Sequence, residues 1–218
     1  AAVGTCTAKA LGRGEAEPLR VLVIGVGGGA LPGWFAQSGA VVDAVELDEA
    51  VLRAATQGMG MPAEVVRAGG SAEELVADAA EKGRAAGSER VYCCDGAAFV
   101  VAAAAAGNLR YDTVIVDCFD GQGKTPPVFY SEEFSTALGS ITECAVANLT
   151  CPVDMWEDAH EYNAPQAGKL VKGWRRGFGE NAGAWTVRVA EGLNIVPAVT
   201  RWGIPPVEFL QQEARDMV

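Results

Sequence analysis

Short apolar runs alternate along the chain with segments of helical composition. Seven runs rich in Val, Ile, Ala and Cys predict buried strands, at residues 20–26, 41–47, 91–94, 113–118, 144–149, 185–189 and 194–199. Helices are expected at residues 30–38, 49–58, 97–106, 131–138, 167–176 and 205–217. This alternation predicts an α/β fold in which helices cover both faces of a mostly parallel sheet. The "AEGL" between the last two strands predicts a C-terminal antiparallel hairpin.

Residues 61–90 interrupt the alternation where a short connection would suffice. Ser71 and Glu74 form a capping-box pattern at the start of a polar helix, "SAEELVADAAEKGRAAG". We interpret 61–90 as a partly helical surface insertion, serving either as a partner contact or as a tolerated loop. The length of 218 residues fits one domain spanning 1–218, and the first residue, Ala rather than Met, predicts a fragment of a longer chain.

Composition and charge exclude several classes. The formal net charge of −11 argues against nucleic acid or an acidic membrane as partner and is compatible with a basic one. No apolar run approaches the about 18 residues of a membrane-spanning helix. The six cysteines form no C-x-x-C pair, which favours small buried side chains in a reducing compartment, hence the cytoplasm. A catalytic thiol or a zinc site remains the alternative.

The stretch "RVLVIGVGGGALP" ends a predicted strand in a cluster of glycines that precedes a helix. Gly25, Gly27, Gly28 and Gly29 surround Val26 in the order expected of a nucleotide-binding turn. Missing side chains let a ligand approach the backbone, and N–H groups at the helix start point toward it. The spacing Gly25-x-Gly27-x-x-Ala30 also fits a dinucleotide site. A turn that merely needs positive φ is the structural alternative.

Acids follow the next two predicted strands. Glu46, with Leu47 after it, ends the second strand about 20 residues beyond the glycines, where an acid holds the ribose hydroxyls of NAD or S-adenosylmethionine. Asp95 and Gly96, in "VYCCDGAAFV", would lie beside an adenine ring, where a dehydrogenase has no need for an acid. This favours S-adenosylmethionine. Asp95 as a helix N-cap is the alternative.

The segment "YDTVIVDCFDG" places Asp117 at the tip of the fourth strand, next to the glycine turn. The methionine amino group or the reacting substrate would lie there. If the nucleophile is an amine, Asp117 or Asp120 would guide or accept its proton. Each also has a structural interpretation, Asp117 as a hydrogen-bond acceptor at the strand tip and Asp120 as a turn residue before Gly121.

The stretch "DMWEDAHEYN", residues 154–163, gathers acids around His160. A metal site is conceivable, but a solvated acidic loop after the fifth strand is the better interpretation, and we expect no metal. Such a loop would line the acceptor pocket, with Trp156 and Tyr162 contacting substrate. The acids from Asp154 to Glu161 would attract a basic peptide.

These motifs resemble class I S-adenosylmethionine-dependent methyltransferases of the spermidine-synthase-like branch, and more narrowly the C-terminal domain of the methyltransferase-like protein 13 family. The resemblance covers about residues 22–200 outside the insertion, through "VLVIGVGGGALPGWF", "VDAVELDEAVLRAAT", "CDGAAFV", "PPVFYSEEF" and "AVANLTCPV". It implies a Rossmann-like, seven-stranded fold. It also implies methyl transfer to a protein amine, because members of that family methylate elongation factor 1-alpha at a lysine and at the N-terminus.

The resemblance assigns roles to named residues. The four glycines wrap the methionine part of the cofactor, Glu46 holds the ribose, and Asp95 and Gly96 hold the adenine. Val26 and Leu47 are also expected to contact the cofactor. Asp117 holds the amino group or the acceptor. The expected partner is a basic protein or peptide; the oligomeric state and the acceptor's identity do not follow from the sequence.

Other functions remain open. Polyamine synthases carry Gly-Gly-Gly-Asp-Gly in the turn, whereas this chain has Ala30 in place of the acid. They also carry an N-terminal hairpin domain, whereas only about 20 residues of this sequence precede the first strand. The spacing of Asp117 and Asp120 nevertheless copies their Asp-x-x-Asp, so aminopropyl transfer is the first alternative. An NAD-dependent oxidoreductase and an inactive domain that scaffolds a partner are the others.

Overall fold

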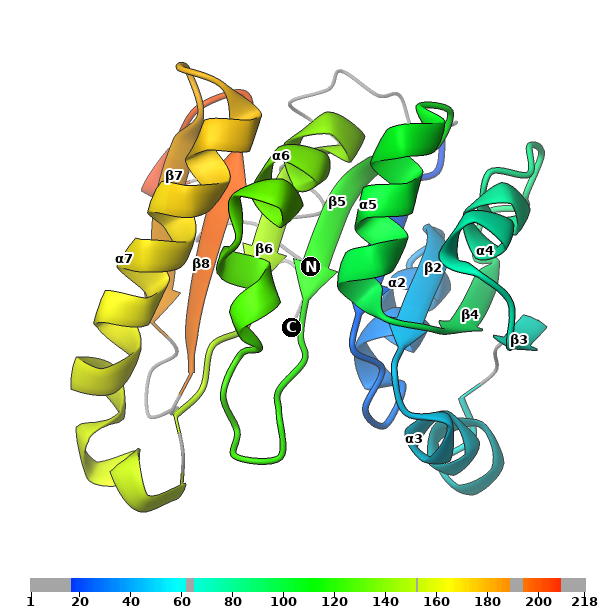
Figure 1. Ribbon diagram of the computed structural model, residues 1–218, viewed down its shortest axis with the longest axis horizontal. Helices are drawn as coiled ribbons and strands as arrows, with labels where there is room; N and C mark the ends of the chain where they lie inside the picture. Colours follow the sequence, from blue (N-terminus) through cyan, green and yellow to red (C-terminus); the bar gives the residue numbers. More distant parts are fainter. Residues whose placement is uncertain (1–16, 62–64, 152, 189–193, 209–218) are drawn as a thin grey trace.

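The computed structural model describes residues 17–61, 65–151, 153–188 and 194–208. Within them, eight strands form one sheet in the order β3-β4-β2-β1-β5-β6-β8-β7 (Figure 1). Neighbours from β3 to β6 pair in parallel, and β8 pairs antiparallel with both β6 and β7. The strands are β1 (Arg20–Ile24), β2 (Val41–Glu46), β3 (Val65–Ala68), β4 (Glu89–Cys93), β5 (Tyr111–Val116), β6 (Thr142–Ala147), β7 (Gly183–Arg188) and β8 (Ile195–Thr200).

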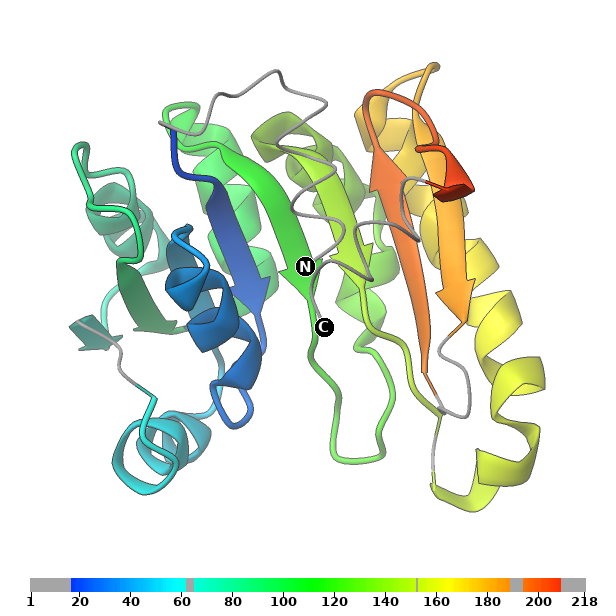
Figure 2. The same cartoon turned by 180° about the vertical axis from the view of Figure 1, so that it is seen from behind.

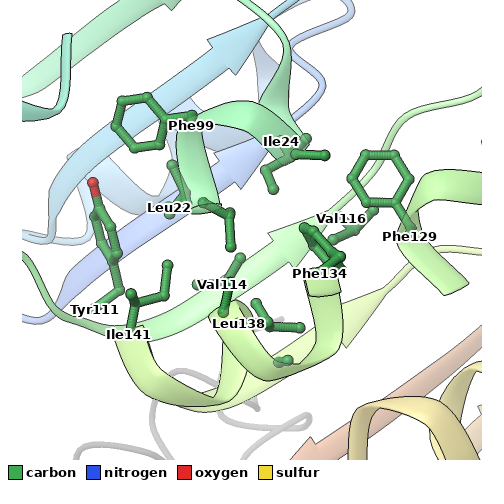
Figure 3. Packing of buried hydrophobic residues seen from close by; sticks show 14 of the residues in the cluster. Leu22, Ile24, Phe99, Tyr111, Val114, Val116, Phe129, Phe134, Leu138 and Ile141 are labelled. Carbon is green, nitrogen blue, oxygen red and sulfur yellow. The ribbon is translucent and has the colours of Figure 1, made fainter. Parts of the chain in front are cut away.

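Helices lie on both faces of the sheet. Figure 1 shows α4 (Ala72–Ala79), α5 (Gly96–Ala106), α6 (Glu132–Ile141) and α7 (Ala159–Phe178) in front of the strands. Figure 2 shows α2 (Ala30–Gln37) on the opposite face, while α3 (Glu49–Arg53) lies beyond the end of β2. The core is correspondingly divided into two clusters of buried side chains, one on each face. Figure 3 shows the larger cluster, in which Phe99 of α5 and Phe134 of α6 pack on Leu22 and Val114.

All seven predicted strands are present, and the predicted mostly parallel sheet with a C-terminal antiparallel hairpin is confirmed. Residues 189–193, which include the predicted "AEGL" connection, lie outside the described residues, as does the terminal helix beyond residue 208. The eighth strand, β3, comes from the segment interpreted as an insertion and forms one edge of the sheet.

The interpretation of 61–90 as a surface insertion was wrong for β3 and α4. Leu75, Val76 and Ala79 of α4 are buried in the larger core cluster. The predicted capping box is present: the Ser71 hydroxyl accepts the Glu74 N–H at 3.3 Å, and the Glu74 carboxylate accepts the Ser71 N–H at 2.9 Å. Because only three residues of α4 are buried and acids lie beside them, the sequence pattern did not show that this helix belongs to the core.

Two predicted helices differ in detail from the structure. The helix predicted at 49–58 has those bounds, but after Arg53 it widens into a π-helical turn, Ala54–Gly58. The helix expected from residue 167 begins at Ala159 and is preceded by a 3₁₀ helix, Val153–Asp158, so residues 154–163 do not form a loop. Pro165 lies inside α7, although proline usually marks the first turn of a helix. The acids and this proline disguised the start of α7.

The amino-terminal halves of the strands hold a buried charge network. Asp43 on β2 is fully buried and forms ion pairs with Arg20 and Arg84. Its carboxylate also accepts a hydrogen bond from the Tyr111 hydroxyl at 3.0 Å. A buried carboxylate needs such partners, because leaving its charge unpaired costs several kcal/mol. The network therefore joins β1, β2 and β5 to the segment before β4.

Candidate functional site

The predicted site residues follow four neighbouring strands at one edge of the sheet. Asp95 follows β4, Glu46 ends β2, Gly25 follows β1 and Asp117 follows β5. These strands are adjacent and parallel, in the order β4-β2-β1-β5, so their carboxyl ends lie side by side. Ligands of open α/β sheets bind in the crevice outside the carboxyl ends of the strands. The fold thus gathers at one edge residues that are spread over 93 positions, from Gly25 to Asp117.

Gly25 joins the ends of three strands. Its φ of 93° lies in the left-handed region, and a Cβ at this position would overlap the Asp117 carbonyl oxygen. Its N–H donates to the Val45 carbonyl at 2.8 Å. By contrast, Gly27 has a φ of 52°, and a Cβ there would meet nothing within 4 Å. Gly25 is therefore required by the packing of β1 on β5, whereas Gly27 faces open space suited to a ligand.

Two methionines lie against the other glycines of the turn. A Cβ on Gly28 would lie 3.0 Å from the Met59 sulfur, and one on Gly29 would lie 2.7 Å from the Met61 Cγ. Gly29 is also the N-cap of α2, with a φ of 78°. Both methionines come just after the π-helical turn, and the sequence analysis did not predict their contact with the glycines. Part of this glycine cluster therefore accommodates neighbouring side chains.

Glu46 lies where the sequence predicted it. Its Oε2 accepts the Val26 N–H at 3.0 Å, and its Oε1 accepts the Asp48 N–H at 3.1 Å. The carboxylate thus connects the end of β2 to the glycine turn, while the neighbouring Leu47 is 69% exposed. Each carboxylate oxygen accepts two hydrogen bonds, so Glu46 keeps capacity for the hydroxyl groups of a ligand.

Asp95 caps α5, as its structural alternative predicted. Its Oδ1 accepts the Ala97 and Ala98 N–H groups at 2.8 and 2.9 Å. The side chain remains exposed at the edge of the sheet, so the cap does not remove it from a ligand's reach. Gly96 has a packing role, because a Cβ there would overlap the Ile24 side chain, which Figure 3 shows in the core.

Asp117 is oriented by two asparagines that the sequence analysis missed. Its Oδ1 accepts a hydrogen bond from Asn148 Nδ2 at 2.9 Å. The Asn148 Oδ1 in turn accepts one from Asn194 Nδ2 at 2.7 Å. Asn148 directly follows β6 and Asn194 precedes β8, so this chain of amides extends across three strands. A polar residue just after the buried strand in "AVANLTC" was the signal that could have found Asn148.

Asp120 organises its own loop. Its Oδ1 accepts the Gln122 N–H at 2.8 Å and the Lys124 N–H at 2.9 Å. These two backbone hydrogen bonds, the one from Lys124 first, lower the pKa of the exposed carboxyl. The predicted alternative, a turn residue, therefore describes Asp120 in this structure, and its catalytic role remains a prediction.

Three cysteines lie half-buried at this edge: Cys93, Cys94 and Cys118. Burial, followed by the charges of Glu46, Asp117 and Asp95, raises the pKa of Cys118 to about 12. Burial also raises the pKa of Cys94 to about 12. Because the thiolate is the reactive form, these thiols are poor nucleophiles at neutral pH.

The described residues contain neither a metal-binding cluster nor a membrane-spanning helix. No group of three or more His, Cys, Asp or Glu residues among them is arranged to hold a metal ion. No helix among them has both the length and the apolar character needed to cross a membrane.

A cavity of about 240 Å³ lies beside the strand edge. Its lining comes from four residues between Lys124 and Tyr130, from Leu149 and Thr150 after β6, and from four residues between Tyr162 and Lys169 of α7. Tyr162, predicted to contact an acceptor, is among the lining residues. Trp156 is 51% exposed and does not line the cavity. The cavity adjoins the Asp117 region because Leu149 directly follows Asn148.

No protein-family model and no curated protein matches the sequence. Solved structures match the fold. Human methyltransferase-like protein 13 in complex with S-adenosylhomocysteine has a TM-score of 0.63 at 21% identity, over 98% of this chain and 85% of that chain. Magnesium protoporphyrin IX methyltransferase from Synechocystis with bound S-adenosylhomocysteine has a TM-score of 0.52 at 16% identity, over 91% and 81%.

Spermidine synthase from Thermotoga maritima has a TM-score of 0.53 at 17% identity, over 89% of this chain and 57% of that chain. Identities in this range establish a shared fold, and function has to be argued from the site. The mostly parallel sheet and its C-terminal antiparallel hairpin agree with the predicted architecture. The chain therefore has the Rossmann-like fold of the class I S-adenosylmethionine-dependent methyltransferases.

Proposed function

We propose that this chain binds S-adenosylmethionine at the Gly25 turn and transfers its methyl group to a protein amine. One observation carries the proposal: Glu46, Asp95 and Asp117 follow neighbouring strands around the turn, and within the described residues none of them forms an ion pair. S-adenosylmethionine presents a sulfonium cation, an ammonium group and ribose hydroxyls. Three carboxylates complement those groups in charge and in hydrogen bonding.

The same charges disfavour a dinucleotide. Glu46 could hold the ribose of either cofactor, but NAD would also bring the negative charges of its pyrophosphate to the glycine turn, where Asp117 lies next to Gly25. Like charges a few ångströms apart repel, and the half-buried position of Asp117 limits screening by water. The dinucleotide-like spacing of the glycines is therefore outweighed by the acids around them.

The bound cofactor would supply a methyl group on a positively charged sulfur, which an uncharged nucleophile attacks in line. The residues of the chain would position the cofactor. Glu46 is placed to bind the ribose hydroxyls, and Asp95 is placed to bind the adenine base. Asp117 Oδ1 accepts from Asn148, which leaves Oδ2 to hold an amine and take its proton. Such positioning contributes roughly 7–11 kcal/mol to lowering a barrier.

The proposed acceptor is a lysine or an N-terminal amine on a basic segment. The net charge of −11 supports a basic partner. Glu157, Asp158 and Glu161 are exposed around the start of α7, the helix that lines the cavity. The fold match to methyltransferase-like protein 13 is an analogy that agrees with this acceptor class. We place this activity in the cytoplasm, a reducing compartment that suits a chain with unbridged half-buried thiols.

Calorimetric titration with S-adenosylmethionine, S-adenosylhomocysteine and NAD tests the cofactor. We expect binding of the first two and none of NAD. Transfer of a labelled methyl group to proteins in a cell extract then tests the acceptor. Binding of NAD alone would replace the proposal with an oxidoreductase, whereas no binding would leave a scaffold domain. Labelling of small molecules alone would overturn the protein acceptor.

Aminopropyl transfer is the second candidate because Asp117 and Asp120 keep the Asp-x-x-Asp spacing. In this structure, however, Asp120 Oδ1 is engaged by two backbone N–H groups of its own turn. We therefore expect no spermidine from putrescine and decarboxylated S-adenosylmethionine. Spermidine formation at ordinary turnover would reverse the ranking of the two functions.

A further inference from the structure

We propose that the cavity beside the strand edge is a subsite for a carboxylate on the acceptor chain, close to the amine that is methylated. The inference rests on the proposed function and adds to it a feature of the acceptor. Its basis is the chemistry of the cavity lining, which differs from that of the molecule as a whole.

The lining contains two lysines and no acid. Lys124 comes from the loop after β5 and Lys169 from α7, so the two cations belong to different walls. The remaining polar lining is neutral, and its hydroxyl and amide groups can donate hydrogen bonds: Thr125, Tyr130, Thr150, Tyr162, Asn163 and Gln166. In a chain with 28 acids and 17 lysines and arginines, an acid-free lining with two lysines is a local reversal of charge.

Neither lysine forms an ion pair among the described residues, although the charge of Lys124 contributes to lowering the pKa of the nearby Asp120. Lys124 Nζ donates to Gln122 Oε1 at 3.2 Å. Lys169 Nζ lies 5.2 Å from the centroid of the Tyr130 ring, a cation–π contact. Both ammonium groups therefore keep donors for an anion. A second ammonium group in this cavity would be repelled, whereas a carboxylate would be attracted from two sides.

The size and place of the cavity define the ligand further. A volume of about 240 Å³ is below the roughly 300–1,000 Å³ of sites that bury drug-sized ligands, so it suits one side chain. Thr150 in its lining is two residues beyond Asn148, which orients Asp117. Two extended residues span about 7 Å. We therefore place the acceptor's acidic residue within about two positions of its amine.

This subsite refines the basic acceptor. Exposed acids at the start of α7 attract a positively charged segment at long range, while the lysines select an acid next to the methylated amine. Long-range attraction and local pairing act on different parts of one peptide, so the two requirements are compatible.

Paired peptides test the subsite. Each nine-residue probe carries one central lysine, basic residues at its ends and either Glu or Gln two positions from the lysine. Fluorescence anisotropy measures binding to the whole chain saturated with S-adenosylhomocysteine. We expect the Glu probe to bind about fivefold more tightly than the Gln probe, the effect of one partly exposed ion pair. The double variant Lys124→Gln, Lys169→Gln should bind both equally.

A matched control uses Lys172→Gln, which removes an exposed charge from the same helix but outside the cavity lining. This variant should keep the preference for the Glu probe. Equal binding of both probes by the parent chain would overturn the subsite, as would a preference that survives in the double variant.

Methyl transfer to the same probes separates the two proposals. Glu-dependent binding without transfer supports the subsite and counts against an amine acceptor. Transfer at equal rates to both probes supports the amine acceptor and overturns the subsite. A base-labile methyl ester on the Glu probe would show that the carboxylate is itself the acceptor, which overturns the proposed role of the subsite.

Discussion

The amino-terminal and carboxyl-terminal ends of the strands both carry acids, but only the acid at the amino-terminal end is paired with arginines. In the amino-terminal half, Asp43 is fully buried and paired with Arg20 and Arg84. At the carboxyl edge, Glu46 and Asp117 accept hydrogen bonds from backbone N–H and amide groups, and the ion pairs of the described residues lie elsewhere. One end is neutralised by the protein's own cations, and the other presents negative charge at its surface.

This difference separates structure from binding. Burial and the charge of Asp43 raise the pKa of Tyr111, which keeps its hydroxyl protonated as a donor to that carboxylate. At the amino-terminal end, the charge of Asp43 is therefore neutralised by the protein's own arginines, without a ligand. The acids of the carboxyl edge are fixed in position but not neutralised, which is the arrangement expected of a site for a cationic ligand. Substitutions at the amino-terminal end should therefore lower stability, whereas substitutions at the carboxyl edge should mainly weaken ligand binding.

The largest effect should follow from Asp43→Ala. Removing this carboxylate leaves Arg20 and Arg84 without their shared buried partner, which should lower the free energy of unfolding by about 3–5 kcal/mol. Urea unfolding measures the change. The folded fraction should bind S-adenosylmethionine as the parent does.

The matched control is Glu81→Ala, whose carboxylate is 62% exposed and pairs with Arg90. It should cost about 0–1 kcal/mol of unfolding free energy. A loss for Asp43→Ala no larger than that of this control would refute the structural role of the buried network.

Gly25→Ala should be the next most disruptive change, because it affects both fold and site. The new methyl group meets the Asp117 carbonyl at a left-handed φ of 93°. Strain of this kind costs about 1–3 kcal/mol, and relieving it would move Asp117. Unfolding and calorimetric titration should therefore both show a loss.

Gly27→Ala should separate the effect on stability from the effect on cofactor binding. A Cβ there meets no protein atom within 4 Å, so the unfolding free energy should fall less than in Gly25→Ala. Cofactor affinity should still fall, because the methyl group enters the space assigned to the ligand. Unchanged affinity in Gly27→Ala would mean that the ligand does not approach this turn.

Glu46→Ala should weaken cofactor binding, and it should also lower the free energy of unfolding by about 1–3 kcal/mol because the Val26 and Asp48 N–H groups lose their acceptor. Loss of the carboxylate leaves ribose hydroxyls without an acceptor, which should cost about 1–3 kcal/mol of binding free energy. Calorimetry with S-adenosylmethionine measures this loss. Glu49→Ala, which removes an exposed acid paired with Arg53, is the control and should bind normally. Binding by Glu46→Ala as tight as the parent's would show that Glu46 is wrongly assigned.

The acids at the carboxyl ends of the strands could be predicted from the sequence. Buried strands such as β5 end in an unbroken apolar run, so the acids directly after them are visible in the sequence. Parallel topology then brings these acids to one edge. The glycine turn was visible for the same reason. The short apolar stripe of α4 was not, because acids at three of its eight positions interrupt the apolar pattern.

Contacts across the sheet were beyond the sequence. Asn194 reaches Asn148 across 46 positions because β8 pairs with β6, an order that local patterns do not specify. The contacts of Met59 and Met61 with the glycines depend on the path of the π-helical turn. The ion pairs of Asp43 likewise depend on how the segment before β4 returns to β2.

The exposed acids at the start of α7 should affect the rate by only a few-fold. Glu157, Asp158 and Glu161 are exposed, so their attraction for a basic peptide is screened as the Debye length falls from about 10 Å at 0.1 M salt to about 3 Å at 1 M. Replacing all three by amides should slow peptide methylation at low salt and remove most of its salt dependence. Cofactor affinity should not change. An unaltered salt dependence would remove these acids from acceptor recognition.

Asp120→Asn should have the smallest effect of all. The asparagine keeps the Oδ1 that accepts the Gln122 and Lys124 N–H groups, so the turn should persist. Because these bonds lower the pKa of Asp120, its contribution to stability is present at neutral pH and is lost only as the pH falls through that lowered pKa. The rate of methyl transfer by Asp120→Asn between pH 6 and 9 should therefore stay within about twofold of the parent's. Asp117→Asn alters the carboxylate next to Asn148 and should slow methyl transfer by at least about tenfold. Equal losses in the two variants would show that both acids act on the acceptor, and the aminopropyl alternative would then regain its strongest support.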